Sequence, residues 1–444
     1  MTTSNSKPLP FDRMLPILVL TFVDVLGLTV IIPILHLYAA AYNATPLQIG
    51  LVAAAFPLSQ LIGVPLMGAL SDRFGRKPLL LISQFSTLIG FLMLAAATSL
   101  EMVILSRVID GVFGANYATA QAAITDLTDD SNRARGLGLA GAAFGIGFLF
   151  GPAIALFAME ISDSLAMPAL VAAAYSGFSI ALTMFSFRET LPPEHRTRDL
   201  GSRRILLTSV SMIRRPTVSP LLALMFLQQM VFFAFETLLG LFLLSRFGIL
   251  GQGSALIFLY VGLILVMAQG RLIGQWSRRF GERRVVQIAL ALLAVGLVLV
   301  SISPEAPHPF YVERIVRNEL RSLAPTATET MIGDIAITLP SENGRGFAGL
   351  LWLGVALVPL TIGAGLIRPA LNTLMIRRVK TDERGAILGV SASFVSAADA
   401  AAPLLGGLLF QTYGASAPFL IGGGIMAGLW LLSRWLIRRE TPPE

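Results

Sequence analysis

Long apolar runs separated by short polar segments dominate the pattern along the chain. Each run reaches the length of about 20 residues that a helix needs to cross the hydrocarbon core of a bilayer. A transmembrane β-barrel would show shorter segments of alternating hydrophobicity instead. The pattern therefore predicts an all-α membrane protein with twelve transmembrane helices, at about 14–38, 46–70, 78–99, 101–125, 136–158, 165–187, 219–243, 254–273, 285–303, 347–376, 385–410 and 415–437.

Composition agrees with a membrane protein and removes several kinds of chemistry. Hydrophobic residues make up 55% of the 444 residues and charged residues only 13%, against about 25% charged in soluble domains. The chain has no cysteine, which excludes disulfides, thiolate catalysis and Cys-ligated metals. Its three histidines, His36, His195 and His308, lack a metal-ligand spacing. We therefore expect no metal and no bound cofactor.

The positions of the basic residues predict the orientation. If the N-terminus lies inside, 26 of the 33 Lys and Arg residues fall at inner ends or loops, five fall outside and two lie within spans. The positive-inside rule then places both termini in the cytoplasm. The net charge of +7 is thereby explained as a topology signal, so we expect no nucleic-acid partner.

The chain contains an internal repeat. Segment 68–77 (GALSDRFGRK) resembles segment 274–283 (GQWSRRFGER), 206 residues later, and Arg135-Gly136 resembles Arg384-Gly385, 249 residues later. An insertion of 43 residues, at 304–346, reconciles the two offsets. We therefore predict two pseudo-symmetric six-helix halves.

The predicted halves are 1–187 and 219–440, joined by a cytoplasmic linker at 188–218. The linker carries seven arginines and several prolines, as a polar crossing segment would. The insert at 304–346 lies on the outer face and includes apolar residues at helical spacing around Val316 and Leu320. It predicts a short amphipathic helix, either a packing elaboration or a lid over the outer mouth.

Several motifs resemble one transporter family. The loop motif of Gly68, Asp72, Arg73, Gly75, Arg76 and Lys77 is similar to the loop 2–3 signature of the major facilitator superfamily. Arg107-x3-Gly111 and Gly147-x3-Gly151-Pro152 resemble its span 4 and antiporter signatures. Asp24 with Gly27 and Pro33 resembles the tetracycline-efflux branch of the drug:H⁺ antiporters. The resemblance covers nearly the whole chain and implies export driven by the proton gradient.

The sequence departs from tetracycline carriers at three places. That family has a further acid in span 3, a histidine in span 8 and an acid in span 9. Here span 3 has Gly90 near the expected place, and spans 8 and 9 have neither group. These departures argue against a tetracycline–metal substrate.

Six ionisable residues lie well inside predicted spans, where a charge is costly and therefore a functional candidate. Asp24 in span 1 and Glu236 in span 7 occupy corresponding helices and are candidates for proton coupling or, alternatively, buried acids paired for packing. Arg107 and Asp110 share a face of span 4, either as a proton-site pair or as a structural pair. Arg368 in span 10 and Asp399 in span 11 are either a structural pair, which we favour, or a functional one.

Polar and aromatic residues within spans could bind a substrate, since small-molecule clefts combine apolar walls with few polar anchors. The alternative for each polar residue is an interhelical hydrogen bond. The candidates are Gln60, Asn116, Gln121, Gln228, Gln229, Phe232, Gln269 and Asn372.

The loop after span 2 predicts a gate. We expect Asp72 to dock on a neighbouring helix N-terminus, where a carboxylate is favoured, and Arg73 to pair with Asp126. The glycines of span 5, including Gly147 and Gly151 before Pro152, are expected to allow close helix packing.

These features predict a secondary active transporter in the inner membrane of a bacterium. The leading hypothesis is proton-coupled antiport of amphiphilic, drug-like molecules by a monomer. The alternative is a proton symporter or facilitator for a metabolite on the same fold. An enzyme is disfavoured because the sequence has no HExxH, GxSxG or Walker motif and no cysteine.

The predicted orientation can be tested directly, because the chain has no cysteine of its own. A cysteine replacing Thr326 should react with a membrane-impermeant maleimide added to intact cells, whereas one replacing Leu200 should not. Labelling at 200 without labelling at 326 would overturn the orientation drawn from the charge count.

Overall fold

The computed structural model describes residues 10–128, 133–162, 164–196, 213–322, 337–379 and 384–436, and none of these residues lies in a strand. Eleven helices among them are long and apolar enough to cross a membrane. The all-α membrane fold predicted from the apolar runs is confirmed, and the count of twelve is not. The inserted cysteine positions 200 and 326 lie outside the described residues.

The chain divides into two compact units, which are described separately. Unit 1 comprises 1–34 and 59–201, and unit 2 comprises 35–58 and 202–444. The predicted boundaries at 187 and 219 stay predictions, but residues 35–58, which we assigned to the first half, cluster with unit 2.

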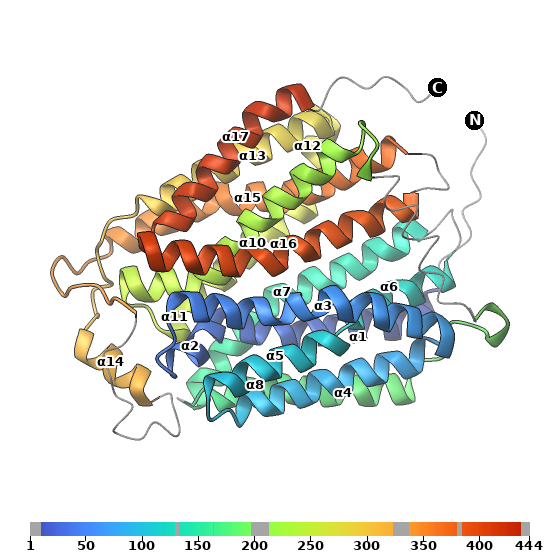
Figure 1. The fold of residues 1–444 in the computed structure, drawn as a ribbon, viewed down its shortest axis with the longest axis horizontal. Coiled ribbons are helices and arrows are strands. Elements are labelled where there is room, and N and C mark those ends of the chain that lie inside the picture. The colour runs from blue at the N-terminus through green and yellow to red at the C-terminus, as the bar shows by residue number, and fades with distance from the viewer. Residues whose placement is uncertain are drawn as a thin grey trace. The chain divides into compact units, whose positions relative to one another are not determined.

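In unit 1, helices α1 and α4 make most of the helix–helix contacts, and α4 lies along the lower edge in the view of Figure 1. Helix α1 packs against α7, α8 and α6, and α4 packs against α8, α5 and α6. The elements are α1 (Phe11–Ile31), η1 (Ile32–Ile34), α3 (Pro46–Phe74, shared with unit 2), α4 (Arg76–Ala95), α5 (Leu100–Phe113), α6 (Asn116–Leu127), α7 (Arg133–Ile161), α8 (Ala166–Phe185) and η2 (Pro193–His195).

Unit 2 repeats this packing pattern. Helix α10 packs against α16 and α17, and α13 packs against α15 and α17, as their predicted counterparts do in unit 1. The elements are α2 (Leu35–Ala40), α10 (Ser219–Phe247), α11 (Gly251–Met267), η3 (Ala268–Leu272), α12 (Ile273–Phe280), α13 (Glu282–Ser301), α14 (Glu313–Ser322), α15 (Ala348–Arg377), α16 (Arg384–Tyr413) and α17 (Ala417–Leu436).

The predicted fourth span is broken into α5 and α6 at Gly114 and Ala115. Side chains of neighbouring helices satisfy the backbone groups that the break leaves open. Gln60 Nε2 donates to the Gly114 carbonyl (2.8 Å), and Ser83 Oγ donates to the Phe113 carbonyl (2.6 Å) while accepting from Ala115 N (2.9 Å). A broken helix inside a membrane requires such partners.

Large apolar side chains on the outside of both units agree with a lipid environment. Phe185 is 86% exposed and Trp435 is 78% exposed. In water such surface would favour association, whereas in a bilayer it contacts acyl chains.

Two of the span 5 glycines bring α7 against α1. A Cβ at Gly147 would lie 2.9 Å from Val25 Cβ, and one at Gly151 would collide with Thr29. Thr29 Oγ1 also hydrogen-bonds to the Gly147 carbonyl at 3.2 Å. The packing explanation holds at these positions and at Gly136, but Cβ atoms at Gly138, Gly141 and Gly145 would meet nothing within 4 Å.

This contrast gives a matched pair of substitutions within one helix. Gly147→Ala should lower the free energy of unfolding by about 1–3 kcal/mol, because it overpacks the contact with α1. Gly145→Ala should leave stability unchanged or raise it by up to about 1 kcal/mol, because alanine favours the helix. Thermal unfolding in detergent would check both, and equal melting temperatures for the two variants would contradict the packing.

Candidate functional site

A hydrogen-bonded chain of side chains surrounds Asp24 inside unit 1. Ser179 Oγ of α8 donates to Asp24 Oδ1 at 2.5 Å, and Gln84 Nε2 of α4 donates to Ser179 Oγ at 2.8 Å. Asp24 Oδ2 is buried and has no hydrogen-bond partner among the described residues. Ser179 and Gln84 are residues that sequence reasoning missed, since a serine and a glutamine in apolar spans carry no motif.

Arg107 and Asp110 form a buried ion pair on α5. Their Nη1 and Oδ2 atoms lie 3.4 Å apart, and each side chain is 3% exposed. The Arg107 guanidinium also lies over the Phe91 ring, 5.3 Å from its centroid. Asp110 is near enough to Asp24 for their charges to interact. Unit 1 thus gathers two acids and one arginine from α1 and α5, beside α4 and α8.

Gly90 provides the space that this pair occupies. A Cβ at Gly90 would lie 3.1 Å from both Asp110 Cβ and the Ser106 carbonyl oxygen. An acidic side chain, such as tetracycline carriers have in this span, does not fit there without a shift of α5.

A second polar cluster lies in unit 2. Gln229 Nε2 of α10 donates to Asp399 Oδ1 of α16 at 2.7 Å. The Asp399 carboxylate also interacts electrostatically with Arg368 of α15 and with Glu236 of α10. The expected structural pairing of Arg368 with Asp399 stays a prediction. Glu236 lies two turns along α10 from Gln229. The neighbouring rings of Phe232 and Phe235 have centroids 6.0 Å apart.

The remaining polar candidates differ in their surroundings. Gln228 Nε2 donates to the Met225 carbonyl of its own helix (3.2 Å), a local structural bond. Asn372 Oδ1 accepts from Ser391 Oγ (3.3 Å), whereas the buried Asn116 Oδ1 has no partner among the described residues. Gln269 is exposed and lies in η3, a π-helical turn, and such turns are frequent at functional sites. Among the described residues, Gln121 accepts a hydrogen bond from Thr125 through its backbone carbonyl and not through its side chain. Its part in substrate binding stays a prediction.

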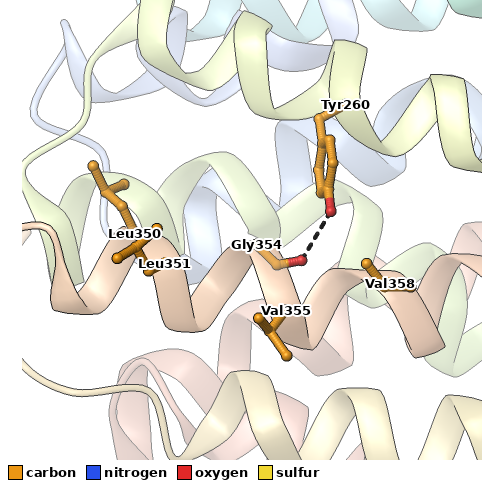
Figure 2. Close-up of a pocket in the computed structure, with 6 residues that line it drawn as sticks. All are labelled: Tyr260, Leu350, Leu351, Gly354, Val355 and Val358. Carbon is orange, nitrogen blue, oxygen red and sulfur yellow. Dashed lines mark hydrogen bonds between the residues drawn. The ribbon is translucent and has the colours of Figure 1, made fainter.

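A groove between α11 and α15 does not involve these residues (Figure 2). It has a volume of about 410 Å³ and is lined by Tyr260, Gly354 and four aliphatic side chains. Tyr260 donates its hydroxyl to the Gly354 carbonyl at 3.0 Å. Leu351 in its wall is 70% exposed, so the groove belongs to the apolar outer surface of unit 2.

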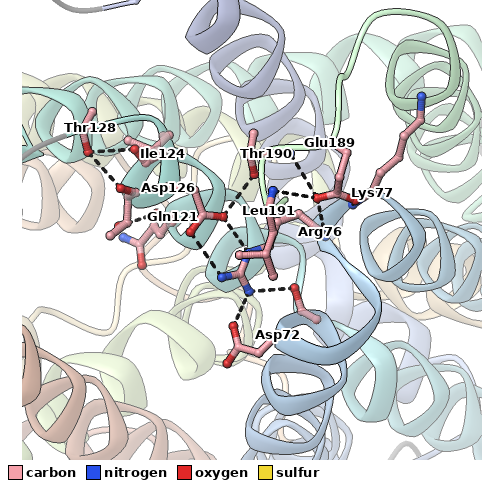
Figure 3. Close-up of polar contacts among 12 residues, drawn as sticks. Asp72, Arg76, Lys77, Gln121, Ile124, Asp126, Thr128, Glu189, Thr190 and Leu191 are labelled. Carbon is pink, nitrogen blue, oxygen red and sulfur yellow. Dashed lines mark hydrogen bonds and ion pairs between the residues drawn. The ribbon is translucent and has the colours of Figure 1, made fainter. Parts of the chain in front are cut away.

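The loop between α3 and α4 is organised by Arg76 and not by Arg73 (Figure 3). The Arg76 guanidinium lies 2.6 Å from Asp72 Oδ1 and 2.9 Å from Asp126 Oδ2, and it also donates to Ser71 Oγ at 3.0 Å. The predicted pairing of Arg73 with Asp126 is therefore wrong. Arg73 lies over the Phe74 ring instead, because it precedes the turn at Gly75 whereas Arg76 follows it.

Glu189 occupies the helix N-terminus that we assigned to Asp72. Its carboxylate accepts from the backbone N–H groups of Arg76 (2.8 Å) and Lys77 (3.1 Å) at the start of α4. A Cβ at Gly75, where φ is +105°, would lie 2.5 Å from Glu189 Oε2. Asp72 pairs with Arg76 instead. Sequence reasoning missed Glu189 because an acid after a span has no distinctive spacing.

Unit 2 carries a charge-reversed counterpart of this network. At the corresponding turn Gly281 has φ of +75°, and Glu282, 206 residues after Arg76, begins α13. Glu282 Oε1 accepts a hydrogen bond from Arg377 Nη2 at 2.9 Å. Arg377 is the last residue of α15, and Asp126 lies at the corresponding place near the end of α6. The acid and the base have exchanged places between the repeats. Gly68, by contrast, has nothing near the place of a Cβ, and no packing reason for it is visible.

The predicted amphipathic helix of the insert is present as α14, and part of the insert, 323–336, lies outside the described residues. Val316 and Leu320 are buried on one face. Tyr311 anchors the segment, since its ring packs on Gly248 at the end of α10 and its hydroxyl donates to the Pro340 carbonyl at 2.9 Å. Burial and the nearby Glu313 and Glu342 carboxylates raise the pKa of Tyr311 to about 12.

Comparisons with known proteins agree on one family. The sequence profile of the Major Facilitator Superfamily matches residues 17–313 and 331–444. Tetracycline resistance protein, class B, of Escherichia coli is 28% identical over 397 residues, which cover 89% of this chain and 87% of that protein. Multidrug resistance protein 2 of Bacillus subtilis is 25% identical and covers 93% of this chain and 92% of its own length.

Solved structures share the fold. The crystal structure of the human organic anion transporter MFSD10 (TETRAN) matches with a TM-score of 0.65 at 21% identity, over 96% of this chain and all of that one. The arrangement of helices is thus that of known transporters, with the polar clusters inside it.

The network at the loop predicts different effects for two neighbouring arginines. Arg76→Gln should lower the free energy of unfolding by about 1–3 kcal/mol, because it leaves the partly buried Asp126 carboxylate without its cation. Arg73→Gln should change stability by less than about 0.5 kcal/mol, as expected for a surface substitution. Transport and thermal unfolding of both variants would check this, and a larger loss with Arg73→Gln would restore the pairing first expected.

Proposed function

The chain belongs to the major facilitator superfamily of membrane transporters, and from that premise we propose that it is a proton-coupled antiporter. It exports amphiphilic, drug-like small molecules by alternating access, and the proton gradient is its only energy source. The protein is a transporter and not an enzyme. Its small-molecule substrate and its multi-pass membrane location follow from the family, whereas the coupling, the direction and the substrate class are the proposal.

The observation that carries the proposal is the surroundings of Asp24. One carboxylate oxygen accepts a short hydrogen bond from Ser179, and the other is buried without a partner among the described residues. An ionised carboxylate in such a place loses hydration that one hydroxyl does not replace. A proton on Asp24 Oδ2 removes the cost of burying the charge. Water that reaches the carboxylate in an open cleft removes the same cost while the acid stays ionised. The site therefore suits an acid that is neutral in one state and ionised in another.

Arg107 and Asp110 supply the second element of the coupling. Their ion pair is buried at 3.4 Å, and Asp110 interacts electrostatically with Asp24. A change in the protonation of Asp24 alters the field on this pair, and a conformational equilibrium can shift only by such differential interactions. The pair thus provides a route by which protonation biases the state of unit 1.

Glu236 supplies the acid in unit 2. It lies on α10, the counterpart of α1 in the repeat, close enough to Asp399 for their charges to interact. Two buried acids that repel each other favour a state in which one of them holds a proton. The first helix of each repeat therefore holds one acid, Asp24 on α1 and Glu236 on α10.

The proposed substrate class comes from the walls of the second cluster and from the relatives. Phe232 lies one turn before Glu236 on α10, so the two side chains share a face of the helix. An acid beside an aromatic ring suits apolar molecules that carry a positive charge. The relatives are named for tetracycline and multidrug resistance. A tetracycline–metal complex is not proposed, because span 3 has Gly90 near the expected place of its acid, span 8 has no histidine and span 9 has no acid.

The proposal includes the cellular setting. We place the chain in the inner membrane of a bacterium, with both termini in the cytoplasm and a monomer as the working unit. The inner ends of α3 and α4 then carry the Arg76 network, which stabilises the inner gate.

Two carboxamide substitutions test the coupling. Asp24→Asn and Glu236→Gln each mimic a permanently protonated acid, so uphill transport driven by a pH gradient should fall at least about tenfold. Exchange of substrate for substrate should persist, because it needs no change in protonation. Both rates can be measured in proteoliposomes with a substrate identified by counterflow screening of amphiphilic cations.

Thermal unfolding of the same preparations separates a coupling defect from a folding defect, since stranding a buried partner destabilises by about 3–5 kcal/mol. Gln60→Glu gives a structural control, because it removes the hydrogen bond from Gln60 to the Gly114 carbonyl at the break in span 4. If both carboxamide variants retain full gradient-driven transport, the acids carry no essential proton and a facilitator becomes the better account.

A further inference from the structure

His36 is a buried titratable group that the proposed coupling does not yet use. His36 lies on α2 and is 4% exposed. Its Nε2 is buried without a hydrogen-bond partner among the described residues. His36 is not expected to bind a metal, because the sequence has no second metal-binding residue at a suitable spacing from it. A buried imidazole with an unpartnered nitrogen calls for another explanation.

The His36 ring packs directly on the backbone of α10 at Gly240. A Cβ at Gly240 would collide with both Cε1 and Nδ1 of the ring, so only glycine allows the contact. The rest of segment 35–58 packs equally closely within unit 2. A Cβ at Gly50 would collide with the Pro403 carbonyl oxygen, and Leu47 N donates to Gln411 Oε1 at 3.2 Å.

This contact lies at the same end of α10 as the insert. Gly240 is followed on α10 by Gly248, on which Tyr311 of the insert packs. The charge count predicts that the insert is on the outer side. The packing of α2 on α10 therefore lies at the end of α10 that the charge count predicts to be on the outer side.

Two charged residues of α10 are close to Gly240 along the helix. Glu236 lies one turn before Gly240 on the same face, and Arg246 lies beyond it, bound to Glu305 at 2.6 Å. In the sequence of segment 35–58 the other titratable side chains are the phenols of Tyr38 and Tyr42. An imidazolium in this position would have no carboxylate bonded to it and two N–H donors to satisfy.

We propose that His36 is a proton-coupling residue of the outer gate, which shuts only when its imidazole is neutral. The inference rests on the proposed antiport. When the outer side is open, the imidazole ring takes up a proton from the outer solution. As α2 returns to α10, the imidazolium gives its proton to ionised Glu236: an N–H bond breaks, an O–H bond forms on the carboxylate, and both groups become neutral. Burial of the uncompensated charge opposes any closure that keeps the proton on the ring.

The shut state can be measured without transport. Ala40→Cys places a single thiol on α2, where the residue is 7% exposed, and Ser341→Cys places one on an exposed part of the insert. Membrane-impermeant maleimide is added outside proteoliposomes at about pH 5.5 and about pH 7.5, on either side of the ordinary histidine pKa of about 6.5. Dividing the Ala40→Cys rate by the Ser341→Cys rate removes the pH dependence of the thiol itself.

The normalised rate should be several-fold higher at the lower pH, because protonated His36 holds the outer side open. In His36→Gln the side chain is neutral at both pH values, so the ratio should be flat. A flat ratio with His36 present, or an unchanged pH dependence in His36→Gln, would overturn the proposal.

A second substitution keeps the test informative if His36→Gln folds poorly. Gly240→Ala leaves His36 in place but prevents the ring from reaching α10, so labelling should be high at both pH values. Adding His36→Ala to Gly240→Ala removes the collision and should restore low labelling. Low labelling in Gly240→Ala alone would show that the contact does not shut the gate.

The transport assay separates failure of this inference from failure of the antiport. If an imposed pH gradient drives no transport in the unaltered protein while labelling depends on pH through His36, the antiport is wrong and the gate is right. If gradient-driven transport is present and His36→Gln leaves both it and the labelling unchanged, the gate is wrong and the antiport stands.

Discussion

The cost of an unpaired charge inside an apolar helix bundle determines where the polar residues of this chain lie. An ion that leaves water must recover its hydration from hydrogen bonds or from an opposite charge. Arg107 recovers it from Asp110 and the Phe91 ring, and Asp399 recovers it from Gln229. Asp24 recovers only part of it, through Ser179. Asp24 is therefore an acid whose charge state can change, which is the basis of the proposed coupling in unit 1.

The same constraint acts at the membrane surface with a different result. Arg76 is 7% exposed but is surrounded by Asp72, Asp126 and Ser71, so its charge is fully paired and it serves as a fixed joint. Unit 2 builds the equivalent joint with the signs reversed, from Glu282 and Arg377. What the repeat preserves is therefore an ion pair at one place in the packing, and not the residue types that form it. A comparison of residues alone would miss this relationship.

The sequence predicted the helices and their repeated packing well because hydropathy and internal repeats are properties of whole segments. It placed eleven spans and the amphipathic helix α14 correctly. It did not predict the break at Gly114, because the partners that stabilise the break, Gln60 and Ser83, come from other helices.

Individual partners were harder to predict for the same reason. Arg73 and Arg76 are equally plausible partners for Asp126 by sequence, and only the turn at Gly75, with its positive φ, decides between them. Likewise Ser179 is 155 residues from Asp24, and Glu189 is 113 residues from the helix N-terminus that it caps. Distant residues meet only in the folded bundle, so the site could be predicted as a set of charged residues but not as a network.

The central claim is that substrate and protons move in opposite directions through the same cycle. The most direct test loads proteoliposomes with the pH-sensitive dye pyranine and imposes a gradient of an amphiphilic cation such as ethidium or tetraphenylphosphonium, with no initial pH gradient. The account predicts that cation entry is accompanied by proton exit, so the interior becomes more alkaline, and that Asp24→Asn abolishes the pH change. Cation entry through the protein with no change in internal pH would contradict it.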